Sequence, residues 1–209
     1  MARRKDHTRE EVKELILSAA RALVAEGGIE ALTARAIATK IGYTAGTIYN
    51  VFTDMNDIVL HLNGETLDRL YIELSRPQHN RKKRPPLANM KSMALGYMRF
   101  AEENRDEWRI LFMLDKTGQN PPPAWYVQKI EQLFEPLEII LAPYFTAMQE
   151  KTHKETARTL WGAVHGLHSL AIAQRLPDNS GQRDVRNMIS RLIENFMAGL
   201  SVKKNLSGD

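Results

Sequence analysis

Apolar residues recur every three to four positions along most of the chain, and no segment alternates with the period of two that a strand would show. This spacing predicts an all-α protein. Thr8 is placed to cap a first helix, with Glu11 three residues later as the partner in a capping box. The pair Gly27-Gly28 is placed to end that helix.

Two short helices are predicted next, separated by a turn that contains glycine. Thr33 is placed to cap the first, Gly42 to end it, and Thr44 to cap the second. The apolar positions expected to pack inward are Ile37, Ala38, Ile41, Ile48 and Phe52. Such a pair is the signature of a helix-turn-helix. The side chains left facing outward would be Tyr43, Thr44, Ala45, Thr47, Tyr49 and Asn50. They form a slim polar surface that suits entry into a major groove.

The rest of the chain is expected to be helical as well. Asp54 is placed to cap a long helix that reaches about Ser75 and that Asn63-Gly64 interrupts. Pro136 and Pro143 are expected to kink or break a later helix. The further helices are predicted at 87–103, around Trp108, at 125–148, at 154–176 and at 183–200. We therefore expect a DNA-binding domain at 1–53 and a larger helical domain at 54–209.

Composition narrows the class of protein. The chain has 209 residues, of which 43% are hydrophobic, so it can bury a sizeable core. It has no cysteine, which excludes disulfides and thiolate chemistry, and its formal net charge of +4 fits an anionic partner. No apolar run approaches the roughly 20 residues that span a bilayer, and the charged start is unlike a secretory signal. We expect a cytoplasmic protein without a membrane partner.

Two basic runs stand out. Arg3, Arg4 and Lys5 open the chain, and a second run covers 81–84 between prolines. The first run is interpreted either as a flexible charged tail or as an arm that reaches into a minor groove, and the sequence favours neither. The second run is interpreted as a solvated loop.

The block from Gly28 to Phe52 resembles the DNA-binding signature of TetR-family transcriptional regulators, with Leu-Thr, Ile-Ala, Gly, a Thr-x-Tyr segment and Phe at the family's spacing. Farther on, Trp161 with His165-Gly166 resembles the Trp-x-x-x-His-Gly signature of one C-terminal subgroup. The resemblance implies about nine helices: a three-helix helix-turn-helix domain, then a larger helical domain that binds a ligand and dimerises.

The resemblance also implies roles for single residues. Thr33 and Tyr49 match positions that hold phosphates, and Arg35 matches one that can reach a guanine edge. The surface offered to bases and backbone would be Tyr43, Thr44, Ala45, Gly46, Thr47 and Asn50. Val51 and Met55 depart from the family pattern, which has a histidine or tyrosine and a phosphate-binding lysine at these places. Thr53, or the arm of Arg3, Arg4 and Lys5, would replace the lost contacts.

Most aromatic side chains lie beyond the long fourth helix and are either ordinary core or the lining of an effector site. The candidates for effector binding are Tyr97, Phe100, Trp108, Phe112, Met113, Trp125, Tyr126, Phe134, His165 and His168. His165 and His168 share one side of a helix but lack a third ligand at a suitable spacing, so no metal site and no cofactor is predicted.

These observations favour a homodimeric regulator, paired through its last two helices, that binds a palindromic double-stranded DNA operator. A small apolar or amphipathic effector would release it, as expected of a repressor, although the sequence does not separate repressor from activator. An enzyme is not expected, because no nucleophile–base pair, phosphate loop or metal triad is present in the sequence. A helical adaptor that binds only proteins is the alternative function.

Overall fold

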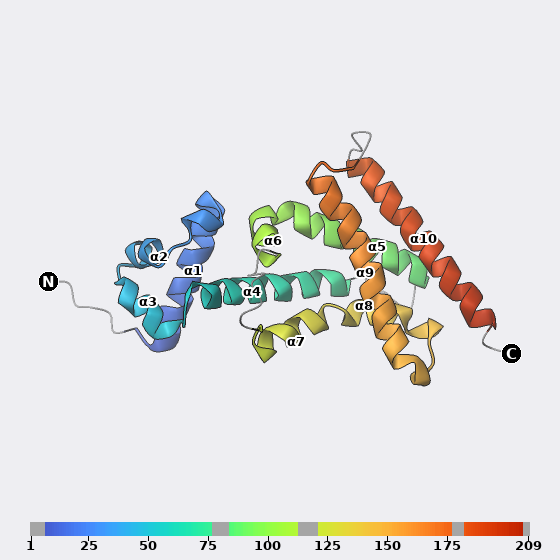
Figure 1. Ribbon diagram of the computed structural model, residues 1–209, viewed down its shortest axis with the longest axis horizontal. Coiled ribbons are helices and arrows are strands. Elements are labelled where there is room, and N and C mark those ends of the chain that lie inside the picture. The colour runs from blue at the N-terminus through green and yellow to red at the C-terminus, as the bar shows by residue number, and fades with distance from the viewer. Residues whose placement is uncertain (1–6, 77–83, 113–120, 177–181, 207–209) are drawn as a thin grey trace. The chain divides into compact units, whose positions relative to one another are not determined.

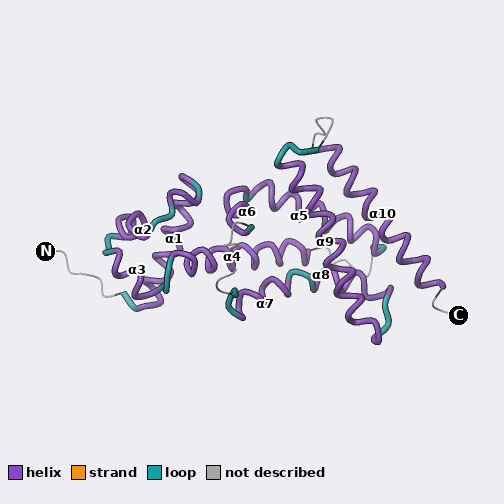
Figure 2. Tube along the Cα trace, in the orientation of Figure 1, coloured by secondary structure: helices purple, strands orange, loops and turns teal. Residues whose placement is uncertain are grey.

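The computed structural model describes residues 7–76, 84–112, 121–176 and 182–206, and these residues form helices, turns and loops without a strand (Figure 2). The all-α prediction is confirmed. The helices in chain order (Figure 1) are α1 Arg9–Gly27, α2 Ala34–Ile41, α3 Ala45–Val51, α4 Met55–Ser75, α5 Pro86–Glu103, α6 Arg105–Leu111, α7 Ala124–Gln132, α8 Glu135–Leu141, α9 Glu150–Ile172 and α10 Gln182–Leu206. Short 3-10 turns lie at Ile29–Ala31, Ala142–Tyr144 and Ala147–Gln149.

The helix ends follow the capping residues seen in the sequence. Thr8 and Glu11 form the expected capping box, and the hydroxyl of Thr33 accepts the Ala36 N–H at 3.1 Å. The carboxylate of Asp54 accepts the Asp57 N–H at 2.8 Å. The expected break falls at residues 133–134, just before Pro136, which stands in the first turn of α8. The local sequence therefore determines where most of the helices begin and end.

The expected interruption of the fourth helix is wrong. Helix α4 runs without a break through Asn63 and Gly64, both of which are buried. The amide of Asn63 donates to the carbonyl oxygen of Ile110 in α6 at 3.4 Å. Packing on this face of α4 outweighs the roughly 1 kcal/mol that a glycine costs inside a helix.

The described chain divides into two compact units, and each is considered by itself. The first, here called the head unit, takes residues 1–68 and 103–126, so α6 and the start of α7 belong with the helix-turn-helix. The second, the body unit, takes 69–102 and 127–209. The domain boundary expected between 53 and 54 stays a prediction.

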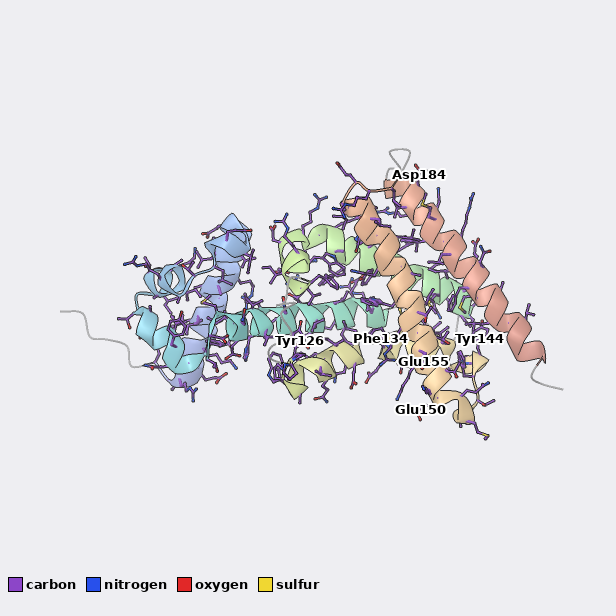
Figure 3. All side chains as sticks on the ribbon, viewed as in Figure 1. Tyr126, Phe134, Tyr144, Glu150, Glu155 and Asp184 are labelled. Carbon is purple, nitrogen blue, oxygen red and sulfur yellow. The ribbon has the colours of Figure 1, made fainter. Side chains whose placement is uncertain are left out.

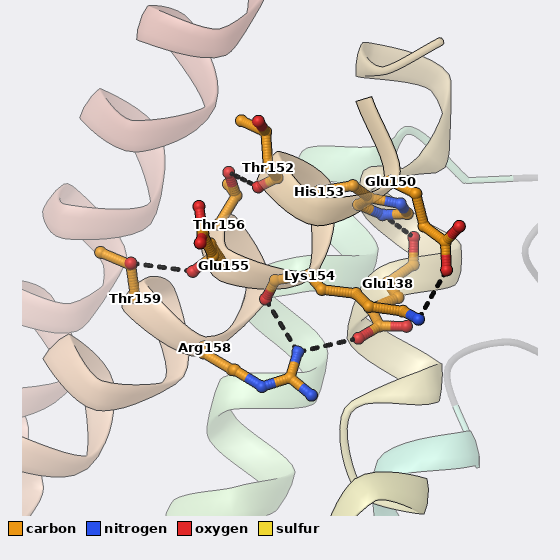
Figure 4. A network of polar contacts seen from close by, with 9 residues as sticks. All are labelled: Glu138, Glu150, Thr152, His153, Lys154, Glu155, Thr156, Arg158 and Thr159. Carbon is orange, nitrogen blue, oxygen red and sulfur yellow. Dashed lines mark hydrogen bonds and ion pairs between the residues drawn. The ribbon is translucent and has the colours of Figure 1, made fainter. Parts of the chain in front are cut away.

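In the body unit, α9 packs against both α8 and α10. Ion pairs join its helices: buried Glu73 with Arg99, Lys91 with Glu194, and Glu102 with Arg186. Figure 4 shows a polar network along α8 and α9, in which Arg158 lies 3.4 Å from the Glu138 carboxylate and donates to the Lys154 carbonyl at 3.0 Å. None of the described helices is long and apolar enough to cross a membrane.

Candidate nucleic-acid interface

Helix α3 is anchored in the continuous apolar core of the head unit. Ile48 and Phe52 are 0% and 2% exposed and belong to the same cluster as Ile37 of α2 and Ile16 of α1. The predicted inward positions are confirmed, with Ile41 packed at the margin of the cluster. Ile110 of α6 also belongs to it. One side of α3 is therefore fixed, which leaves its opposite side to present side chains.

The turn between α2 and α3 is set by Gly42. Its φ of 74° lies in the left-handed region that glycine adopts without a steric penalty. The Gly42 N–H donates to the carbonyl of Thr39, and the Tyr43 N–H donates to that of Ala38 at 2.9 Å. These two bonds are those of a Schellman motif, which ends α2 sharply. The chain then reaches Thr44, the cap of α3, two residues after Gly42.

The first turn of α3 satisfies its own polar groups. The Thr44 hydroxyl accepts the Thr47 N–H at 3.3 Å and lies 3.0 Å from the Thr47 hydroxyl. Thr47 is half-buried, whereas Thr44, Ala45 and Gly46 are exposed. A Cβ placed on Gly46 would meet only the Thr44 oxygen, at 3.7 Å. The tip of the helix is thus small enough to approach a groove closely.

Farther along α3, the exposed side chains are larger and polar. Tyr49 is 52% exposed and Asn50 is exposed beside it. Thr33 and Arg35 at the start of α2, and Thr53 after α3, are exposed as well. Among the residues that the structure describes, none forms an ion pair with Arg35, while nearby Lys40 is paired with Glu26 at 2.7 Å. The guanidinium of Arg35 is therefore available to an anionic or base-edge partner.

Tyr43 differs from the other predicted surface residues. Its ring packs against the apolar core of the head unit, and its hydroxyl lies 2.7 Å from Nδ1 of His7. Sequence reasoning placed Tyr43 outward and gave His7 no role, because nothing in the local pattern links two residues that are 36 positions apart. Arg3, Arg4 and Lys5 lie outside the described residues.

The candidate effector residues fall into two groups, one in each unit. In the head unit, Trp108 contacts Phe112 edge-on, and Trp125 contacts Tyr126 edge-on. Burial raises the pKa of Tyr126 (Figure 3) to about 12, and a hydrogen bond with Asn63 acts in the opposite direction. Met113 lies outside the described residues.

The group in the body unit is held together by polar contacts. The Tyr97 hydroxyl lies 2.7 Å from Nδ1 of His165, and Nε2 of His165 lies 3.2 Å from the Ser169 hydroxyl. Burial raises the pKa of Tyr97 well above its ordinary value, and a hydrogen bond with Trp161 partly opposes that rise. His165 is half-buried, and burial lowers its pKa. In the sequence, the Trp161-to-Gly166 motif singled out His165 of this network, whereas no motif singled out Ser169.

An aromatic column continues from this network along α9. The rings of His165 and Trp161 are stacked, with 5.1 Å between their centroids. Trp161 meets Phe134 (Figure 3) edge-on at 5.7 Å, and the Arg158 guanidinium lies 4.7 Å from the Phe134 ring centre. His168 is buried beside Tyr97, and Phe100 contacts the Arg69 guanidinium. Among the described residues, no three His, Asp or Glu side chains gather as metal ligands.

Comparison with known proteins identifies both parts of the chain. Residues 16–62 match the family model for bacterial regulatory proteins of the tetR family. Residues 90–196, more than half of the chain, match the model for the tetracyclin repressor-like C-terminal domain. Among curated proteins, none matches the chain.

Solved structures share the fold at low sequence identity. The regulatory protein SCO4313 is 16% identical, with a TM-score of 0.69 over 91% of this chain and 97% of its own. A TetR-like transcriptional regulator from Rhodococcus sp. RHA1 is 16% identical, with a TM-score of 0.59 over 92% of this chain and 99% of its own. The multidrug binding protein EbrR, solved with imidazole, is 17% identical, with a TM-score of 0.59 over 90% of this chain and 96% of its own.

Proposed function

Because this chain belongs to the TetR family of bacterial regulatory proteins, it is a DNA-binding transcriptional regulator, and we propose that it is a repressor released by a small-molecule effector. The observation that carries the proposal is the two-sided character of α3. Ile48 and Phe52 anchor it in the head core, while Tyr49 and Asn50 are exposed on it. As part of this proposal, the protein acts on double-stranded DNA in the cytoplasm, and this role needs no catalytic site.

The proposed contacts follow from exposure and chemistry. Asn50 and Arg35 carry the donors that read base edges in the major groove, with arginine suited to guanine and asparagine to adenine. The Tyr49 phenol and the hydroxyls of Thr33 and Thr53 suit phosphate oxygens. The remaining contacts are proposed for Thr44, Ala45, Gly46 and Thr47 at the tip of α3, and for Arg3, Arg4 and Lys5. The domain assignment of 1–53 to DNA binding is part of this proposal.

The proposed partner is a second copy of the chain, paired through α9 and α10. Both helices carry small and apolar residues that are exposed or half-buried. They are Gly162, Gly166 and Leu170 on α9, of which Gly166 is half-buried, and the exposed Met188, Gly199 and Val202 on α10. A Cβ at any of these three glycines would meet no described atom within 4 Å. Glycine inside an exposed helix costs stability unless another helix packs closely on it. Two copies would place their recognition helices about 34–36 Å apart on the duplex.

The proposed effector site lies in the body unit, around Tyr97, Phe134 and His165. Aromatic rings and a few convergent hydrogen-bonding groups are typical of sites for small amphipathic molecules. The stacked pair of Trp161 and His165 supports the assignment of the C-terminal domain to the Trp-x-x-x-His-Gly subgroup. An effector bound there would favour a state of the dimer in which the two heads are spaced wrongly for the operator, and DNA would be lost by population shift.

The test is selection of duplexes from random oligonucleotides by the full-length protein, followed by affinity measurement at several salt concentrations. We expect a palindromic consensus and an affinity that falls as salt rises, because phosphate contacts release counterions. A protein that enriches no sequence, even at low ionic strength, would overturn the regulator proposal and favour a protein–protein adaptor. Small molecules that raise the melting temperature by mass action would then be tested for release of the selected duplex.

A further inference from the structure

We propose that His7 is a phosphate-binding residue of the DNA interface and that Tyr43 holds its ring in place. The pair donates a hydrogen bond to a phosphate oxygen of the operator beside the start of α3. Tyr43 is a positioning residue in this arrangement and does not touch a base. The inference rests on the proposed DNA-binding function and adds to it a contact from outside the helix-turn-helix.

The imidazole of His7 lies beside the recognition helix, although 36 positions separate it from Tyr43. Its Nδ1 is 2.7 Å from the Tyr43 hydroxyl, and Tyr43 directly precedes Thr44, the cap of α3. Helix α1, which begins at Arg9, packs against α3 within the head unit (Figure 1). When a recognition helix lies in the major groove, the helix before it meets the backbone that borders the groove. His7 is therefore placed where a phosphate would lie.

Tyr43 limits the orientations that the imidazole can adopt. The Tyr43 ring packs on the core of the head unit, so its hydroxyl has a fixed position. The two rings are tilted by 47° with 6.3 Å between centroids, and both side chains are half-buried. A side chain that is already held loses less rotamer freedom when it binds a partner. The contact with DNA therefore costs less entropy than one from a free histidine.

The bond between the two residues leaves one hydrogen-bond donor over. A neutral phenol and a neutral imidazole carry one exchangeable proton each, and only one of these can lie between Nδ1 and the phenol oxygen. If the phenol donates, the imidazole proton is on Nε2; if Nδ1 donates, the phenol proton turns outward. A protonated imidazole has a proton on both nitrogens. In each state the pair can still donate, and within the described part of the chain His7 bonds only to Tyr43.

The residue next to His7 is occupied by other contacts. The Thr8 N–H donates to the Glu11 carboxylate at 2.7 Å, the Thr8 hydroxyl lies 3.1 Å from the same oxygen, and the Glu11 N–H donates to the Thr8 hydroxyl at 3.2 Å. Thr8 is thus committed to the capping box, and the donor beside Tyr43 comes from His7. Base edges lie deeper in the groove, where the tip of α3 is proposed to enter, so the acceptor for His7 is a phosphate oxygen.

The experiment is a thermodynamic cycle between protein variants and single phosphates of the DNA. The probe is the duplex that the full-length wild type selects, with each phosphate replaced in turn by an uncharged methylphosphonate. Affinities of the wild type, of His7→Ala and of the control Tyr49→Phe are measured on every duplex by fluorescence anisotropy. Tyr49→Phe removes an exposed phenol hydroxyl from α3, which is proposed to contact a different phosphate. Melting temperatures establish that each variant is folded.

We expect one phosphate in each half-site at which the methylphosphonate weakens the wild type about two- to tenfold, the range of a typical single hydrogen bond, and hardly affects His7→Ala. Tyr49→Phe should keep the full effect at that phosphate. Equal losses for the wild type and His7→Ala at every phosphate would overturn the contact, because His7 would then act only through the fold. An unchanged affinity of His7→Ala for the unmodified duplex would overturn it as well.

Conservative variants separate the phosphate contact from the bond to Tyr43. His7→Gln carries an amide N–H near the position of Nε2 and should keep part of the coupling to the phosphate. His7→Asn can accept the phenol proton near the position of Nδ1 but has no donor farther out, so it should lose the coupling. Tyr43→Phe keeps the packed ring and should weaken the coupling.

The opposite order, with coupling kept in His7→Asn and lost in His7→Gln, would overturn the phosphate contact. A wild type that binds no duplex would overturn the proposed function itself, and this outcome is distinct from a wild type that binds DNA without coupling at His7.

Discussion

The imidazole of His61 meets the ring of Phe52 edge-on, with 5.2 Å between centroids and 84° between planes. Phe52 is the residue that ends α3, and His61 lies in α4, where it also contacts the Trp125 ring at 5.0 Å. The end of the recognition helix is thus packed within the head unit against residues from both α4 and α7.

Replacement of Phe52 should test how firmly α3 is anchored. Phe52→Ala removes a ring that is 2% exposed, so we expect the free energy of unfolding to fall by about 3–5 kcal/mol. Urea denaturation followed by circular dichroism measures it. The matched control is Tyr49→Ala, which removes an aromatic ring that is half exposed and should cost less than about 1 kcal/mol while weakening DNA binding. Equal stabilities for the two variants would contradict the buried anchor.

Arg35 should contribute to base recognition. Arg35→Ala is expected to weaken binding to the selected duplex by about 1–3 kcal/mol and to relax the preference at one base pair. Fluorescence anisotropy and a repeated selection measure the two effects. Arg175→Ala removes an exposed arginine of the body unit and serves as the charge-matched control, with little expected loss. An unchanged consensus and affinity for Arg35→Ala would remove this residue from the interface.

Substitution of Gly162 tests whether this side of α9 is a free surface or part of a dimer interface. In an isolated chain, Gly162→Ala should stabilise α9 by about 0.5–1 kcal/mol, because the new methyl group meets open space. In the proposed dimer the same methyl group would push two helices apart, so the dissociation constant measured by analytical ultracentrifugation should rise. Gly162→Leu should raise it further. The control is Thr152→Ala at the exposed start of α9, and a tighter dimer for Gly162→Ala would contradict pairing at this face.

The histidines of α9 should make stability depend on pH. Burial lowers the pKa of His165 and His168, although Glu102 partly opposes the change at His168. Below about pH 6.5, the ordinary imidazole pKa, the unfolded chain therefore binds protons more readily than the folded protein does. The free energy of unfolding should be greatest above that pH and should fall as the pH drops toward the lowered values.

Urea denaturation of the wild type and of the variant His165→Gln/His168→Gln, at about pH 7.5 and about pH 5.5, measures this effect. The two glutamines do not titrate, so the variant should lose less stability between these pH values than the wild type, whatever its stability at neutral pH. A larger pH-dependent loss in the variant would show that other groups dominate the acid sensitivity.

Features that depend on near neighbours in sequence could be predicted. Thr8, Thr33 and Thr44 begin helices because a hydroxyl can accept an N–H three residues later, and Gly42 ends one because it tolerates a positive φ. The buried side of α3 followed from helical spacing. Such rules depend on one segment at a time, which is why Thr44, Ala45, Tyr49 and Asn50 were correctly predicted to be exposed. Tyr43 and Thr47, also predicted to face outward, are half-buried.

Contacts between distant segments could not be predicted in this way. Periodicity says which side of a helix is apolar but not which helix covers it, so the bond of His7 with Tyr43 had no local signal. The motif around His165 singled out that residue but not Tyr97 as its partner. The same limit explains the error at Gly64: helix propensity disfavours glycine there, and only the packing of α4 reveals why the helix continues. The aromatic residues were grouped by sequence region, whereas the fold divides them between two units.

The small tip of α3 has an evolutionary consequence. Since a side chain added at Gly46 would find only an ordinary van der Waals neighbour in Thr44, and since Ala45 is exposed, new groups can be introduced at both positions without disturbing the head. In the proposed complex each new group would face different base edges. If α3 reads the operator as proposed, single substitutions at positions 45 and 46 would therefore redirect the protein to new promoters without altering the body unit.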